Sequence, residues 1–295
     1  MAFTFDGYEE ISADLDQASK WFEKIGLSTT GSRLNALQTL LRAFLVDMQS
    51  LPREEVVAKW SANKTYYALA DARGFARIAR EIGKMPHRLP LHKLRTILSG
   101  PLDPTDENPS DATVQARNFF AELELAADLS SKGLPIIGFD DVQIRFDGRD
   151  LYFECKRIHS ASRVAANVNK AVEQLSTKMP DDRARGFITV VLDRLTGVDR
   201  MILRVYNDEE VTTAAQEQVS KFLERYAAEF QPPVDTRIVA ACFVLHFLVF
   251  HVPRNMVGTA YMFAIVPYVS QHLLEYSDRQ LLESFAAYSN AGDTT

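Results

Sequence analysis

The chain has 295 residues, of which 46% are hydrophobic and 24% are charged. This composition excludes a collagenous, disulfide-framework or wholly disordered protein, and the length predicts a core domain with an accessory domain. Only two cysteines are present, Cys155 and Cys242, which are too few for a zinc knuckle and fit a reducing compartment.

The N-terminus and the apolar stretches predict a cytoplasmic protein without membrane association. Acids stand at the N-terminus where a secretory signal needs a basic and then an apolar segment. The longest apolar stretch, Ile238 to Val252, contains His246 and His251 and is shorter than the roughly 20 residues that a membrane-spanning helix needs. We interpret this stretch as buried core.

Charged residues are unevenly distributed around a net charge of −6. The net charge of successive blocks is −3 for residues 1–50, +6 for 51–100, −7 for 101–150, +4 for 151–206 and −6 for 207–295. Two basic blocks thus flank an acidic block, which suits a site where phosphates meet carboxylates around a cation. Solvated helix faces are the alternative explanation.

The first hundred residues predict helices. Apolar residues recur at three- and four-residue spacing in 32–48 and again in 66–83. The stretch 100–110, rich in proline and acids, then predicts a linker. We therefore expect a helical accessory domain over 1–105, an α/β domain over 106–289 and a flexible tail over 290–295.

Helices and strands alternate in the predicted α/β domain. A helix from Asp111 to Lys132 ends at Gly133, in the manner of a C-cap. We expect strands in 134–139, 142–146, 150–158, 186–195, 237–250 and 259–269, and further helices over 162–179 and 211–230. This order predicts a mixed sheet flanked by helices.

A hairpin over residues 139–159 carries the candidate chemistry. Asp147-Gly148 is a strong signal for a two-residue turn, because both central positions of a type I′ turn need positive φ. The turn would pair Val142 with Phe153 and Asp141 with Glu154.

Alternation along the strands then sorts the side chains between the two faces of the hairpin. Asp141, Glu154 and Lys156 share the polar face, and the two carboxylates would have Cβ atoms about 4.5–5.5 Å apart. Opposed like charges destabilise a hairpin, and a divalent cation such as Mg²⁺ would compensate them. The alternative is a solvated sheet face with Glu154 paired to Lys156 or Arg145.

The neighbouring helices offer further candidates. Glu122 lies on or beside the apolar stripe of the first helix, where a carboxylate is costly without a partner, although it could merely edge that stripe. The helix over 162–179 has a polar ridge, and Gln174 and Lys170 could flank the site unless this ridge is solvated. The ridge residues are Asn167, Lys170, Gln174 and Lys178.

At these residues the sequence resembles the PD-(D/E)xK nucleases, the family with the restriction-endonuclease-like fold. The resemblance covers about residues 114–192. It rests on Glu122 in a helix, Asp141 at a strand start, Glu154-Cys155-Lys156 as the E-x-K motif, Gln174 in the next helix and the order α-β-β-β-α-β. Phe139-Asp140 stands where a proline would precede the metal-binding aspartate.

The resemblance implies a Mg²⁺- or Mn²⁺-dependent nuclease, either an endonuclease or an exonuclease, that acts on DNA or, less often, RNA. It implies that Asp141, Glu154 and the backbone carbonyl of Cys155 bind the metal. Lys156 would orient or activate water, and Glu122 would support the site or join a second metal. A catalytically silent protein of the same fold, which binds nucleic acid or a protein partner, is the alternative.

A basic ridge lies in the predicted helical domain. Arg73, Arg77, Arg80 and Lys84 stand at helical spacing and could contact phosphates of a nucleic acid. A solvated face paired with acids is the alternative. The same domain is the candidate surface for a protein partner or a second copy of the chain.

Overall fold

A computed structural model describes residues 2–4, 8–60, 62–103, 106, 112–196, 202–231, 235–254, 256–267 and 275–291. The N-terminal part is helical from Tyr8 onward, as predicted. Its elements are α1 (Tyr8–Lys24), α2 (Arg33–Ser50), α3 (Arg53–Lys59), α4 (Ala62–Ile82), the 3-10 helix η1 (Pro86–Arg88) and α5 (Leu91–Ile97).

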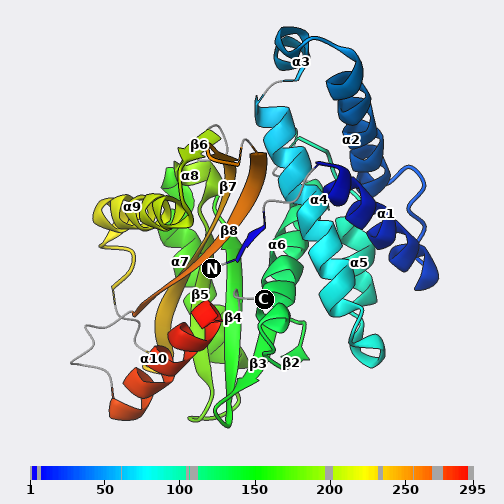
Figure 1. Ribbon diagram of the computed structural model, residues 1–295. Coiled ribbons are helices and arrows are strands. Elements are labelled where there is room, and N and C mark those ends of the chain that lie inside the picture. The colour runs from blue at the N-terminus through cyan, green and yellow to red at the C-terminus, as the bar shows by residue number, and fades with distance from the viewer. Residues whose placement is uncertain are drawn as a thin grey trace.

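The rest of the chain builds a mixed sheet between helices, which confirms the predicted α/β class (Figure 1). The helices are α6 (Ala112–Ser131), a 3-10 helix (Ala161–Arg163), α7 (Val164–Lys178), α8 (Asp193–Thr196), α9 (Asp208–Tyr226) and α10 (Tyr276–Ala291). The strands are β1 (Ala2–Thr4), β2 (Ile136–Gly138), β3 (Val142–Phe146), β4 (Arg149–Arg157), β5 (Arg185–Val191), β6 (Ile202–Val205), β7 (Ile238–His251) and β8 (Met256–Pro267).

The strand order is β1-β8-β7-β5-β4-β3-β2, and β6 pairs with the C-terminal end of β7, residues 248–251. Strands β2, β3 and β4 form an antiparallel meander, and α7 then crosses over to β5, which lies parallel to β4. The segment α6-β2-β3-β4-α7-β5 therefore has the predicted order α-β-β-β-α-β.

Both faces of the sheet are buried. One cluster of apolar residues joins α6, α10 and the helices α1, α2, α4 and α5 to one face, and a second cluster packs α7 and α9 against the other. The long apolar strand β7 is buried along most of its length, as the sequence predicted. No helix in the described part of the chain has both the length and the apolar character needed to cross a bilayer.

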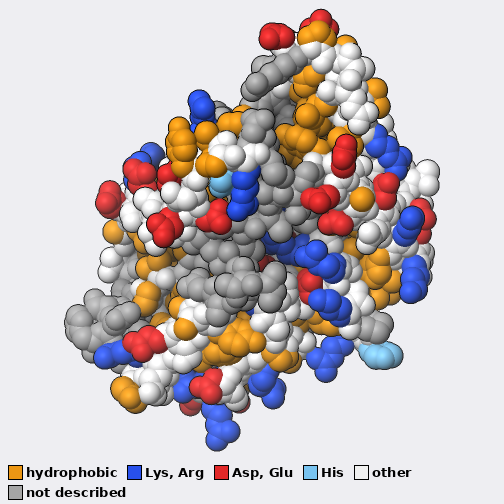
Figure 2. Space-filling model, viewed as in Figure 1, with side chains coloured by type: hydrophobic (Ala, Val, Ile, Leu, Met, Phe, Trp, Pro, Cys, Tyr) orange, Lys and Arg blue, Asp and Glu red, His pale blue; other side chains and the backbone are white. Residues whose placement is uncertain are grey.

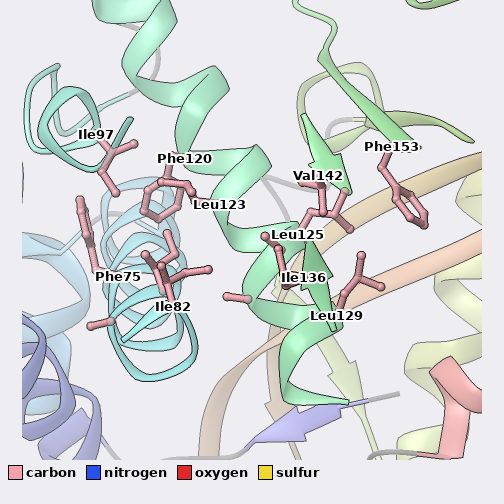
Figure 3. Packing of buried hydrophobic residues seen from close by; sticks show 14 of the residues in the cluster. Phe75, Ile82, Ile97, Phe120, Leu123, Leu125, Leu129, Ile136, Val142 and Phe153 are labelled. Carbon is pink, nitrogen blue, oxygen red and sulfur yellow. The ribbon is translucent and has the colours of Figure 1, made fainter. Parts of the chain in front are cut away.

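Helix α6 lies between the N-terminal helices and the sheet. Phe120 and Leu123 face α4 and α5, whereas Leu125 and Leu129 face the β2–β4 meander (Figure 3). Gly74 allows α4 to approach α6, because a Cβ atom there would lie 2.4 Å from Cζ of Phe120. One continuous core therefore spans the predicted boundary between the helical and α/β parts.

Several elements differ from the prediction. Strand β1, strand β6 and helix α10 were not predicted, because each is too short or too weakly patterned to signal itself. The predicted strand 186–195 ends at Val191, where α8 soon follows. Residues 290 and 291 of the predicted tail belong to α10, and 292–295 lie outside the described residues, as does most of the predicted linker.

A buried ion triad joins three of the helices. Asp71 of α4 accepts hydrogen bonds from Arg33 of α2 at 3.1 Å and from Arg117 of α6 at 3.0 Å. Burial opposes ionisation of Asp71, but Arg117 and Arg33 outweigh it and hold the pKa of Asp71 below its ordinary value. Burial, reinforced by the charge of Arg117, lowers the pKa of Arg33 to about 10.

Replacing Asp71 with alanine should therefore destabilise the fold strongly, because two buried guanidinium groups lose their shared counter-charge. We expect a loss of about 3–5 kcal/mol in the free energy of unfolding, measured by urea denaturation. Glu217→Ala breaks an exposed pair with Lys221 and is the control, with an expected loss below about 0.5 kcal/mol. Equal losses in the two variants would contradict a structural role for the triad.

Candidate functional site

The hairpin has the register that its turn sequence predicts. Asp147 and Gly148 adopt φ values of 49° and 70°, and Val142 stands opposite Phe153. Asp141 lies just before the first residue of β3, so the strand ladder itself ends at the Val142–Phe153 pair. The turn therefore places Asp141 and Glu154 at the same end of the hairpin.

The carboxylate end of the polar face is buried, whereas Arg145 near the turn is 57% exposed. Glu154 pairs with Lys156, as the alternative interpretation expected, but this pair is not on a solvated face. Glu154 and Asp141 are only 3% and 4% exposed. Phe153 and Cys155 point to the opposite face, toward the core that α6 covers. The two carboxylates therefore need compensating partners within the protein.

Two lysines supply these partners. Lys178, the last residue of α7, donates hydrogen bonds to Oδ2 of Asp141 and, at 3.2 Å, to Oε2 of Glu154. Lys156 donates to Oε1 of Glu154 and, at 2.5 Å, to Oε1 of Gln174. The structure thus brings together Asp141, Glu154, Lys156 and Gln174, as the sequence predicted.

Lys178 is a site residue that the sequence analysis did not select. It was recognised only as part of the polar ridge of its helix, although its place four residues after Gln174 puts both on one helix face. Lys170, which was selected, is exposed, and no hydrogen bond or ion pair joins it to the described residues of the site. Lys178 reaches the site and Lys170 does not because the C-terminal end of α7 lies over the hairpin, and this packing cannot be read from the sequence of the helix.

Burial of the carboxylate pair changes its ionisation. Desolvation and then the charge of Glu154 raise the pKa of Asp141 to about 7, although Lys178 acts in the opposite direction. Partial burial would lower the pKa of Lys178, but its hydrogen bond with Asp141 and the charge of Glu154 outweigh this effect and raise it. The site therefore holds a proton on Asp141 more tightly than an exposed aspartate would.

Glu122 lies near this group but has its own partner. Lys93 of α5 donates to Oε2 of Glu122 at 2.5 Å and to the backbone oxygen of Asp140 at 3.2 Å. Burial raises the pKa of Glu122 against the opposing charge of Lys93, and the charges of Glu154 and Lys156 also act on it. The N-terminal helices thus contribute Lys93, a residue with no local signal in the sequence.

The neighbouring Glu124 is more deeply buried than Glu122. Its side chain is 5% exposed and its Oε2 lies 3.0 Å from Nε2 of His246 on β7. Glu122 was expected on or beside the apolar stripe of α6, and its side chain is 15% exposed. Both glutamates are largely buried because α6 packs against the N-terminal helices on one side and against the sheet on the other. A single buried face is therefore not a good description of this helix.

The donor set is suited to a hard divalent cation. No group of three or more His, Cys, Asp or Glu arranged to hold a metal is present among the described residues. Two carboxylates are nevertheless sufficient for Mg²⁺, which keeps several waters. Burial raises the pKa of the Cys155 thiol, so this residue could contribute only its backbone carbonyl, a role that remains a prediction.

The predicted basic ridge does not form one exposed surface. Arg73 donates to the backbone oxygen of Thr259 at 2.8 Å, and Arg77 lies over the ring of Tyr261 and 3.6 Å from Asp128. Arg80 and Lys84 are more than half exposed and both pair with Glu81. Figure 2 shows Lys and Arg side chains, with acids among them, on the side of the molecule where α4 and α5 lie.

Comparison with known proteins adds no further assignment. No family model, no curated protein and no solved structure matches the chain.

The raised pKa of Asp141 makes a prediction about stability. Between pH 4 and about 7 the folded protein binds a proton that the unfolded chain has released, so the free energy of unfolding should fall as the pH rises. Asp141→Asn removes this dependence. Relative to the wild type, the variant should gain about 2–4 kcal/mol between pH 4.5 and pH 8, measured by urea denaturation with a chelator present.

The control for this prediction is Asp140→Asn, which changes an exposed carboxylate in the same turn. A constant difference between Asp141→Asn and the wild type across this pH range would contradict the assigned ionisation of Asp141.

Proposed function

We propose that this protein is a Mg²⁺-dependent nuclease that hydrolyses phosphodiester bonds, in DNA more than in RNA. The observation that carries the proposal is the joint burial of Asp141 and Glu154, next to Lys156 and within electrostatic reach of Glu122. Burying two adjacent carboxylates is costly unless cations compensate them, as the two lysines do and as a divalent metal ion would. The preference for DNA rests on the resemblance of the sequence to the PD-(D/E)xK nucleases.

The proposed role of each residue combines its position with what the resemblance implies. Asp141 and Glu154, with the backbone carbonyl of Cys155, would hold the metal, which when bound supplies a Lewis acid and a water of lowered pKa. Gln174 accepts a hydrogen bond from Lys156 and holds its ammonium group beside Glu154. From there Lys156 would offset the charge of a substrate phosphate and orient water. Glu122, held by Lys93, supports the site from α6.

A second candidate function is supported by a specific observation. Lys178 and Lys156 already neutralise the carboxylate pair without any metal. A protein that had lost catalysis and only bound nucleic acid or a protein partner could keep such a neutral, buried network for stability. The two candidates differ in whether the carboxylates are needed for cleavage or only for folding.

Substitution of the metal-binding residues tests the proposal. We expect Asp141→Asn and Glu154→Gln each to lower the cleavage rate by at least about 100-fold, because each removes a charged ligand of the metal. Lys156→Met should lower kcat by about 100-fold and change metal affinity less. Single- and double-stranded DNA and RNA, incubated with Mg²⁺ or Mn²⁺, provide the assay.

Glu217→Gln changes an exposed side chain of α9 that pairs with Lys221, and this control variant should cleave like the wild type. Circular dichroism should show that every variant is folded. Cleavage at the wild-type rate by all three site variants would contradict the site, and a folded wild type that cleaves none of the four substrates would favour the silent protein.

The exposed half of the basic ridge makes a separate prediction. If Arg80 and Lys84 contact phosphates, the variant Arg80→Ala/Lys84→Ala should bind nucleic acid more weakly at all sequences. Each lost contact should lower the slope of log K against log salt by roughly 0.7–0.9, measured by fluorescence anisotropy with a chelator present.

The matched control, Lys221→Ala/Arg225→Ala, removes the same charge from α9 on the other side of the sheet (Figure 1). An equal slope for the wild type and the Arg80/Lys84 variant would show that this part of α4 does not contact phosphates.

A further inference from the structure

Lys178 occupies the position at which the two carboxylates meet. Its ammonium group binds one oxygen from each, Oδ2 of Asp141 and Oε2 of Glu154, whereas Lys156 binds the other oxygen of Glu154 alone. Among the described side chains, Lys178 is thus the one that bridges the pair. A divalent cation shared by the two carboxylates would compete with Lys178 for these oxygens.

The two lysines also differ in how firmly they are held. Lys156 lies on a central strand, is anchored by Gln174 and has a side chain that is 12% exposed. Lys178 is the last residue of α7, and its side chain is 32% exposed. A long, flexible side chain at a helix end can turn toward solvent without disturbing the fold, whereas a lysine in the middle of the sheet has no such freedom.

We propose that Lys178 is a built-in counter-cation that stabilises the metal-free site and that a divalent metal ion has to displace. The inference rests on the proposed function only in placing the metal at Asp141 and Glu154. Displacement lowers the apparent metal affinity, because the metal binds only the fraction of molecules in which Lys178 has left the pair.

Metal affinity of the whole protein tests the displacement. We expect Lys178→Met to bind Mn²⁺ about tenfold more tightly than the wild type, measured by calorimetric titration or by the electron paramagnetic resonance of free Mn²⁺. Lys170→Met removes the same charge from the same helix without a contact to the carboxylates, and it should change the affinity less than about twofold. Lys178→Arg keeps the charge and should bind Mn²⁺ no more tightly than the wild type.

A second measurement needs neither metal nor cleavage. In chelator at pH 8, Lys178→Met should lower the melting temperature by about 2–4 °C, because the carboxylates lose their shared cation. The same substitution in the Asp141→Asn background should lower the melting temperature by less, since one of the two charges is already absent. Equal shifts in both backgrounds would contradict the role of Lys178 as counter-cation.

The outcomes separate this inference from the proposed function. Equal Mn²⁺ affinities in Lys178→Met, Lys178→Arg and the wild type would overturn the displacement and leave the nuclease proposal intact. Absence of Mn²⁺ binding in all variants would overturn both. Should Lys178→Met fail to fold, Lys178→Arg decides, because an affinity above that of the wild type would contradict the inference.

Discussion

The two-residue turn at Asp147 and Gly148 is the constraint on which the site depends. It sets the register between β3 and β4, and a shift of one residue would exchange the two faces of the hairpin. Phe153 would then lie under α7, and Glu154 would face the apolar side of α6. The positive φ at both turn positions thus decides which carboxylates share a face, although each carboxylate lies six residues from the turn.

The site draws residues from four elements of the fold and from the segment before β3. Glu154 and Lys156 come from β4, Lys178 and Gln174 from α7, Glu122 from α6, Lys93 from α5, and Asp141 from the segment before β3. Acids and lysines alternate in it, so that each buried charge lies beside an opposite one. Such a network is costly to assemble and unstable when one member is lost, so the metal ion we propose would have to replace a charge that is already present.

The uneven distribution of charge along the chain corresponds in part to pairing inside the protein. Lys93 and Arg77 belong to the basic block 51–100, and they pair with Glu122 and Asp128 of the acidic block that follows. These pairs hold the N-terminal helices against α6. Only part of the basic block, including Arg80 and Lys84, is therefore exposed to a partner such as a nucleic acid.

Local features could be predicted from the amino-acid sequence: the helices of the N-terminal part, the hairpin and its register, and the convergence of Asp141, Glu154 and Lys156. These follow from side-chain periodicity and turn chemistry, which act over a few residues. Other features became visible in the folded protein: α7 ends with Lys178 over the carboxylate pair, Lys93 reaches Glu122, and Arg73 and Arg77 lie against the sheet. Those contacts join residues that are distant in the chain, and the packing of helices on the sheet, which no local pattern encodes, brings them together.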